Sequence, residues 1–155
     1  MIKADVLIAN KNWKKHIGAP SFYINKKLRK IDKKLSIFKR NNFIFTILLS
    51  GDNEVKKLNN KFRKKNKTTD ILSFPFHEKK TLNKLLKNKK SQIYLGDIII
   101  NLNKVITKIK EKNFLLNFDK IWMHGLAHLL GYRHESDSDF FTMAKLEDKL
   151  IKFSK

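Results

Sequence analysis

The segment His124-Gly-Leu-Ala-His128-Leu-Leu-Gly131-Tyr-Arg-His134 dictates how its part of the chain folds and what it can bind. Residues four apart lie one turn above each other on a helix, so His124 and His128 can present two imidazoles to one metal ion. Gly131 permits the left-handed turn that ends a helix, which would return His134 as a third ligand. Three histidines leave a coordination position open, as in a catalytic zinc site. We therefore expect one zinc ion (Zn2+) per chain, although imidazole also binds other divalent ions.

The histidines have two other interpretations. They could be surface or core residues that fall together by coincidence, but three of the five histidines of the chain lie within eleven residues. The spacing H-x-x-x-H-x-x-G-x-x-H is also the framework of the metzincin peptidases, and Met143 lies downstream where a Met-turn would be sought. Those enzymes carry a glutamate general base after the first histidine, whereas Gly125 has no side chain to move a proton. A metallopeptidase is therefore the less favoured function.

Length and composition indicate one soluble domain. The 155 residues suffice for a single domain, 1–155, with its own hydrophobic core. Cysteine is absent, so a metal must be held by histidine or carboxylate, and a reducing, cytoplasmic location is expected. The first residues, MIKADVLIANKNW, lack the apolar stretch of a signal peptide, and no run approaches the roughly 20 apolar residues that span a bilayer. We expect no membrane partner.

A formal net charge of +21 suggests a polyanionic partner such as RNA. Lysine supplies 31 of the 35 basic residues, however, and abundant lysine with Asn, Ile and Phe is also typical of an AT-rich genome. The charge alone leaves both explanations open. Arginine is scarce and more informative, because only its planar guanidinium can grip a phosphate with two parallel hydrogen bonds. The four arginines are Arg29, Arg40, Arg63 and Arg133.

Hydrophobic periodicity predicts a mixed α+β fold. Short apolar or alternating stretches predict strands at 5–10, 43–49, 70–76 and 95–101, of which the third contains Pro75 and should therefore lie at a sheet edge. Helical spacing predicts five helices, at 20–35, 52–62, 102–112, 117–131 and 136–150. Residues 77–91 are rich in lysine with scattered leucines, and we interpret them as a mobile basic loop or insertion, part of it helical. We expect a mixed sheet of about four strands packed with about five helices, and the metal site at a helix end.

Four blocks of the sequence resemble one family of proteins. The histidine segment reads HGLAHLLGYRH, and the family motif is approximately H-G-x-L-H-L-x-G-Y-D-H. Three further blocks match in order along the chain: Leu58-Asn-Asn-Lys-Phe-Arg63 followed by Thr69-Asp70-Ile-Leu-Ser73-Phe-Pro75-Phe, then Leu95-Gly96-Asp97-Ile, and the tail Met143-Ala-Lys-Leu-Glu147. With these blocks the chain resembles, over nearly its whole length, the YbeY family of bacterial ribosome-associated endoribonucleases.

The resemblance implies a zinc-dependent cut of single-stranded RNA, in rRNA maturation at the small-subunit 3′ end and in ribosome quality control. The implied partners are single-stranded RNA, rRNA and the ribosome or its small subunit, with no DNA specificity. His124, His128 and His134 take the places of the metal ligands, His124 also counts as catalytic, and Arg63 takes the place of the active-site arginine. The nucleophile, a metal-bound water or a neighbouring 2′-hydroxyl, stays open. Without the matching block that begins at Leu58, Arg63 would be interpreted as a basic residue favoured at the C-terminal end of a helix.

Other positions carry weaker implications. Ser73 and Asp97 are expected to line the site, but both could be strand-end or turn residues. Arg133 stands where the family commonly has aspartate; a cation there costs metal affinity while it offers a phosphate contact, and Glu135 could compensate for it. Thr68 replaces a proline and should loosen its loop. The alternative to an enzyme is a ribosome-associated RNA-binding factor in which the metal is mainly structural.

Overall fold

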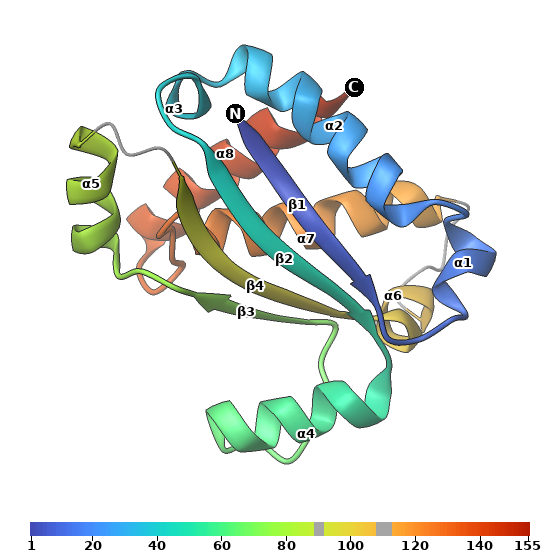
Figure 1. Ribbon diagram of the computed structural model, residues 1–155. Helices are drawn as coiled ribbons and strands as arrows, with labels where there is room; N and C mark the ends of the chain where they lie inside the picture. Colours follow the sequence, from blue (N-terminus) through green and yellow to red (C-terminus); the bar gives the residue numbers. More distant parts are fainter. Residues whose placement is uncertain (89–91, 108–112) are drawn as a thin grey trace.

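A four-stranded sheet forms the centre of the molecule in the computed structural model, which describes residues 1–88, 92–107 and 113–155. Its strands are β1 (Ile2–Ile8), β2 (Phe43–Ser50), β3 (Ile71–Pro75) and β4 (Ile93–Asn101), in the order β1-β2-β4-β3 (Figure 1). β1, β2 and β4 are parallel, whereas β3 runs antiparallel to β4. The predicted mixed sheet is confirmed, and the strand with Pro75 lies at its edge.

Three long helices form the layer on one face of the sheet. Helices α2 (Pro20–Lys34) and α7 (Phe114–Leu129) pack on the strands, and α8 (Asp137–Ser154) packs on both helices (Figure 1). The main core lies in this layer, where Leu28, Phe118, Trp122 and Ile98 are fully buried. Each such side chain stabilises the fold by roughly 1.5–3 kcal/mol. This packing holds α7, which carries the first two histidines, against the sheet.

A buried carboxylate also ties α2 to α7. Asp119 is 5% exposed, and its oxygens accept hydrogen bonds from the Tyr23 hydroxyl and the Trp122 indole at 3.0 Å each. The Lys27 ammonium pairs with the same carboxylate at 2.8 Å. Burial, together with the Asp119 charge, raises the pKa of Tyr23 well above its usual range. Tyr23 and Lys27 of α2 thus contact one buried carboxylate of α7, and this charge is paired rather than isolated.

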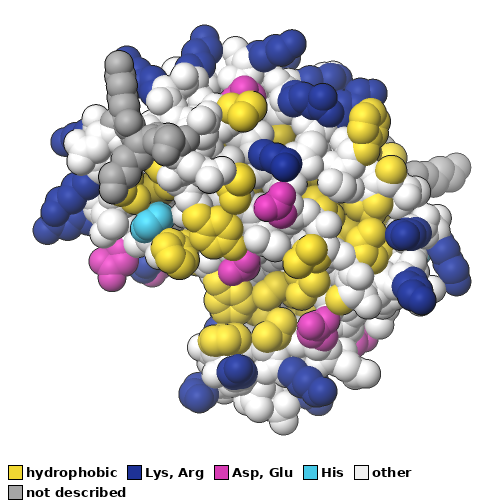
Figure 2. Space-filling model, in the orientation of Figure 1, with side chains coloured by type: hydrophobic (Ala, Val, Ile, Leu, Met, Phe, Trp, Pro, Cys, Tyr) yellow, Lys and Arg dark blue, Asp and Glu magenta, His cyan; other side chains and the backbone are white. Residues whose placement is uncertain are grey.

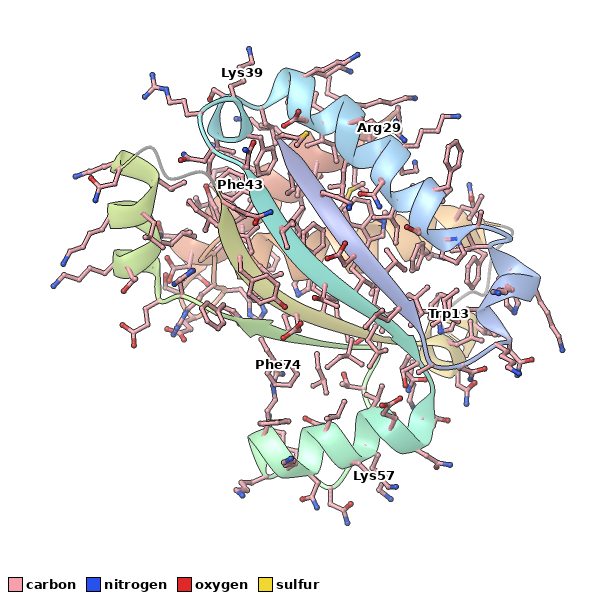
Figure 3. All side chains as sticks on the ribbon, in the orientation of Figure 1. Trp13, Arg29, Lys39, Phe43, Lys57 and Phe74 are labelled. Carbon is pink, nitrogen blue, oxygen red and sulfur yellow. The ribbon has the colours of Figure 1, made fainter. Side chains whose placement is uncertain are left out.

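Helix α4 (Asp52–Arg63) lies on the opposite face of the sheet, below the strands in Figure 1. Val55 of α4 forms a small core cluster with Leu72 and Ile99, against which Phe74 packs. Phe74 extends from β3 toward this helix (Figure 3). Figure 2 shows hydrophobic side chains gathered where the sheet meets α4, and Lys and Arg mostly around the rim of this view. Successive strand residues point to opposite faces, so β3 and β4 each contribute to both cores.

The described residues form eight helices, more than the five predicted. The five predicted helices are present as α2, α4, α6 (Leu102–Thr107), α7 and α8. The additional three are α1 (Trp13–His16), α3 (Ser36–Lys39) and α5 (Lys79–Lys87). The first two span only four residues each. One helical turn is too short to show the apolar repeat from which helices are predicted.

Helix α5 occupies most of the segment 77–91, which was predicted to be a mobile basic loop or insertion with some helix. Its Leu82 is buried in the main core, and Lys79 contacts the turn at Gly131. The Lys79 ammonium lies 5.6 Å from the centre of the Tyr132 ring. The helical part therefore supports the loop between α7 and α8. Residues 89–91 lie outside the described residues, and the mobility of the segment stays a prediction.

Within the described ranges, none of the helices combines the length and the apolar character that crossing a membrane requires.

Candidate metal centre

The end of α7 brings the three histidines together. The Asn113 side chain caps the helix by accepting a hydrogen bond from the Leu116 N–H, and the helix then runs through His124 and His128. It ends at Leu129, and Gly131 two residues later has a φ of 85°, in the left-handed region. The Tyr132 N–H donates to the Ala127 carbonyl and closes the turn. The chain then returns His134 to the same side, as predicted from the sequence.

The three imidazoles form one compact cluster. One ligand atom from each of His124, His128 and His134 lies within 4.8 Å of the other two. The Nε2 atoms of His124 and His128 face each other at 3.1 Å. Two nitrogens bound to one tetrahedral zinc at about 2.0–2.1 Å each lie roughly 3.3 Å apart, so this separation suits a shared ion.

The hydrogen bonds of the ring Nδ1 atoms support a cation at this place. The Nδ1 of His128 lies 3.0 Å from the Tyr132 carbonyl oxygen, and the Nδ1 of His124 lies 2.8 Å from the Glu147 carboxylate. A carbonyl or carboxylate oxygen only accepts, so both Nδ1 atoms must donate. In a neutral ring the Nε2 is then unprotonated, and two lone pairs face each other at 3.1 Å. An ion between them turns this repulsion into coordination, so the residues present fit a bound metal.

The electrostatics favour the neutral ligand form of His128. Burial lowers its pKa, and the nearby His124 and His134 rings add to the effect, while the hydrogen bond to the Tyr132 carbonyl opposes it. A metal ligand must present a lone pair rather than a proton. His128 is therefore prepared to bind an ion at neutral pH.

Glu147 on α8 is a residue of the centre that the sequence did not single out. Its carboxylate oxygen is the 2.8 Å partner of the His124 Nδ1, and the two side chains are about one-third exposed. The tail block Met143–Glu147 was the available signal, but a block match does not say what a residue touches. Glu135 was the carboxylate considered from the sequence, because it is adjacent to His134.

Gly125 lets α7 approach the sheet closely. A Cβ at this position would lie 2.8 Å from the Ile71 Cδ1 and 2.9 Å from the Ile98 Cδ1. These distances are shorter than carbon–carbon contacts allow. A side chain at position 125 would thus point into the sheet, so a glutamate base of the peptidase kind has no room there.

Arg63 lies at the outer edge of β3, the strand on which α7 packs. Helix α4 ends just after it, at Lys64 with a φ of 56°, and the Arg63 guanidinium donates to the Ser73 carbonyl at 3.3 Å. The guanidinium carbon also lies 6.0 Å from the centre of the Phe74 ring. Ile71, two residues before Ser73, is the residue that meets α7 at Gly125. The arginine thus comes from the opposite face of the sheet to the edge beside the helix that carries the histidines.

A polar cluster holds the loop between Arg63 and β3. Asp52 accepts hydrogen bonds from the fully buried Asn101 at 2.7 Å, from Asn103 at 2.8 Å and from the Thr68 hydroxyl at 3.2 Å. These amide donors lower the pKa of Asp52. Asn101 also donates to the Thr68 hydroxyl at 2.8 Å. Thr68 was expected to loosen this loop, but its hydroxyl instead ties the loop to α4 and β4.

The other residues predicted to line the site are spread over the molecule. Ser73 is buried on β3, two residues from Ile71 and on the same face of the strand. Asp97 lies on the far face of the sheet, in a cavity of about 440 Å³ beside α4, and accepts a hydrogen bond from Tyr94. Arg133 and Glu135 are exposed and pair with each other at 3.2 Å. The structure brings the three histidines together, places Arg63 and Ser73 at the adjacent edge, and separates Asp97 from the histidines by the sheet.

Comparisons of the whole sequence relate this chain to known proteins. The sequence profile of the family described as Endoribonuclease YbeY matches residues 7–155. The chain is 42% identical to Endoribonuclease YbeY of Pelagibacter ubique over 159 residues, which covers all of the chain and 97% of that relative. It is 43% identical to Endoribonuclease YbeY of Thermodesulfovibrio yellowstonii over 131 residues, 82% of the chain and 74% of that relative.

A solved structure shares the fold. The solution structure of TM1509 from Thermotoga maritima aligns with a TM-score of 0.61 over 99% of this chain and 89% of that one, at 23% identity. At this low sequence identity, the similarity supports a shared fold and nothing more. The match of the family profile to nearly the whole chain, with relatives above 40% identity, shows that this chain belongs to the endoribonuclease YbeY family.

Proposed function

We propose that this protein is a zinc-dependent endoribonuclease that cuts single-stranded RNA in the cytoplasm. Its role would be rRNA maturation, notably at the small-subunit 3′ end, and ribosome quality control, with the ribosome or its small subunit as partner. Membership of the endoribonuclease family supports RNA as the substrate. The observation that carries the proposal is the pair of facing Nε2 atoms of His124 and His128, with both Nδ1 atoms already engaged.

In this proposal the histidines hold the ion and Arg63 holds the substrate. His124, His128 and His134 would be the ligands, and a bound ion would polarise the phosphate or lower the pKa of a water. The structure shows one hydrogen bond from the guanidinium to a described residue, and a guanidinium carries five N–H donors. Arg63 can therefore donate two parallel hydrogen bonds to the phosphate oxygens, where negative charge grows during cleavage. The Ser73 carbonyl accepts a hydrogen bond from the guanidinium and holds it at the edge of β3.

The products distinguish the two candidate nucleophiles. Attack by a neighbouring 2′-hydroxyl leaves a 2′,3′-cyclic phosphate on the upstream fragment, because the attacking oxygen belongs to the RNA. Attack by water leaves a linear phosphate on one fragment. Analysis of the ends by mass spectrometry, together with a substrate that carries a 2′-deoxy sugar at the cut, assigns the nucleophile. A deoxy substrate that is still cut at that bond indicates water.

The proposed activity is tested with His128→Ala and Arg63→Ala on a single-stranded rRNA fragment. We expect His128→Ala to lose both bound zinc and cleavage. Arg63→Ala should keep its zinc but lose roughly 10²–10³-fold in cleavage rate, the usual effect of removing one donor that stabilises transition-state charge. Arg29→Ala, on α2, is the matched control for loss of a guanidinium. RNA binding by all variants without zinc-dependent cleavage by the wild type would favour the RNA-binding factor with a structural metal instead.

A further inference from the structure

We propose that Glu147 is a positioning residue of the metal centre, which holds the His124 ring so that its Nε2 faces the ion. This inference rests on the metal function proposed above. Its basis is the 2.8 Å contact between the Glu147 carboxylate and the His124 Nδ1, across 23 residues of sequence and from a different helix. Neither the histidine motif nor the match to the family profile assigns a role to this carboxylate.

The contact with Glu147 selects one of the two neutral tautomers of the His124 ring. A neutral imidazole carries its proton on either Nδ1 or Nε2, and only the nitrogen without it can bind a metal. The Glu147 carboxylate accepts from Nδ1 and thereby leaves the Nε2 lone pair toward His128. His128 is fixed in the same tautomer by the Tyr132 carbonyl. The carboxylate additionally makes the ring a stronger metal ligand and places a negative charge near the site of the cation.

The fold determines where this carboxylate lies. Glu147 is four residues after Met143 and three before Leu150, so all three share one face of α8. Met143 and Leu150 are 2% and 0% exposed. Their burial sets the rotation of α8, and the carboxylate between them is therefore brought to His124 by core packing rather than by its own contact.

The neighbouring carboxylate does not have this geometry. Glu135 is next to His134 in sequence, but its side chain is 72% exposed and its carboxylate pairs with Arg133. An exposed pair of this kind contributes about 0–1 kcal/mol and holds neither side chain firmly. The Glu147 carboxylate, in contrast, lies 2.8 Å from the Nδ1 of a ring of the cluster.

The test compares Glu147→Gln and Glu147→Ala with the exposed neighbour Asp148→Asn as a control for the loss of charge on α8. Zinc affinity is measured by chelator competition, without RNA. We expect Glu147→Ala to bind zinc roughly 10–100-fold more weakly, the usual effect of removing such a partner. Glu147→Gln should lie in between, because its amide oxygen still accepts from Nδ1 but carries no charge. Asp148→Asn should match the wild type.

A second measurement reports on the ring itself. In ¹⁵N-resolved spectra of the zinc-loaded protein, the Nδ1–H proton of His124 should exchange with water faster in Glu147→Ala than in the wild type, whereas that of His128 should not change. Helical content measured by circular dichroism checks that the variants are folded. Unchanged zinc affinity in both Glu147 variants, or an unchanged His124 signal in Glu147→Ala, would overturn the inference.

These outcomes are separate from those that test the proposed function. If the wild type cuts RNA with zinc but the Glu147 variants bind zinc normally, the positioning role is wrong and the endoribonuclease stands. If the Glu147 variants lose zinc affinity as expected but the loaded wild type leaves RNA intact, the positioning role stands and the proposed activity is wrong.

Discussion

At the scale of single residues, the metal centre depends on which nitrogen of each ring is free. The sequence predicts which histidines gather, because their spacing matches a helical turn and a glycine-ended helix. It does not predict what holds the rings. The partner of His128 is a backbone carbonyl and that of His124 is a carboxylate from another helix. Both follow from tertiary packing, which spacing along one helix does not describe.

Asp52 provides a prediction at this scale. Its amide partners lower its pKa in the folded protein relative to the unfolded chain, so its charged form stabilises the fold. Asp52→Asn should therefore have a lower free energy of unfolding than the wild type at pH 7. The difference should shrink as the pH falls below about 4 and through the lowered pKa, because the wild-type side chain then becomes neutral as well.

The measurement is urea denaturation of both proteins at pH 7 and at the lowest pH at which both are folded. Asp148→Asn, on the exposed side of α8, serves as the control for an equal change in net charge. An Asp52→Asn deficit that is as large in acid as at pH 7 would show that the carboxylate charge does not stabilise the cluster.

At the scale of elements, the close approach of α7 to the sheet sets the position of the histidines. The contact at Gly125 is the tightest point, because a Cβ there would meet Ile71 and Ile98 below 3.0 Å. Gly125→Ala gains up to about 1 kcal/mol of helix propensity. Overpacking of a fully buried core typically costs about 1–3 kcal/mol, so we expect net destabilisation in urea denaturation.

A second substitution isolates the cause. Ile98→Val removes the Cδ1 atom that lies 2.9 Å from the added Cβ. If steric conflict explains the effect, Gly125→Ala should cost less stability in the Ile98→Val background than in the wild type. Equal costs in both backgrounds, or a Gly125→Ala protein more stable than the wild type, would contradict this explanation.

Most elements were predictable because their signals are local. The edge strand with Pro75 and the cap of α8, where the Ser136 hydroxyl accepts from the Asp139 N–H at 3.1 Å, follow from propensity and hydrogen-bonding chemistry. The first strand was expected at 5–10 but spans Ile2–Ile8. Its register is set by pairing with β2, which alternation within the strand alone does not fix. The segment of α5 was predicted to be only part-helical, and its core residue Leu82 was not predicted because lysines dominate its composition.

At the scale of the whole molecule, the sheet places the predicted site residues on two different faces. Ser73 and Asp97 both lie in blocks that resemble family motifs, yet they point to opposite faces of the sheet. Which face a strand residue occupies changes with every step of one residue, so a sequence block does not reveal it. Arg63 reaches the edge beside the histidines only because α4 ends there and β3 offers a carbonyl. The place of Arg63 at this sheet edge is thus a property of the fold.

The net charge of +21 gives a prediction for the whole surface. If RNA is bound through several phosphates, the affinity must fall as salt rises, with a slope of about −0.7 per contact for a single strand. We expect His128→Ala, which should bind RNA without cutting it, to show a slope steeper than about −3 in a plot of log affinity against log salt. Filter binding or fluorescence anisotropy measures it. If the affinity does not change with salt, the amino-acid composition typical of an AT-rich genome is the better explanation of the many lysines.

If the three-histidine centre is a metal site that drives RNA cleavage, a zinc titration of the activity reveals it. Metal-stripped wild-type protein receives zinc in increments, and the initial rate of cleavage of a single-stranded small-subunit 3′-end fragment is measured at each step. We expect no cleavage without zinc and a rate that rises and saturates near one zinc per chain. Equal cleavage by the stripped and loaded protein, or no cleavage by protein shown to hold one zinc, would contradict it.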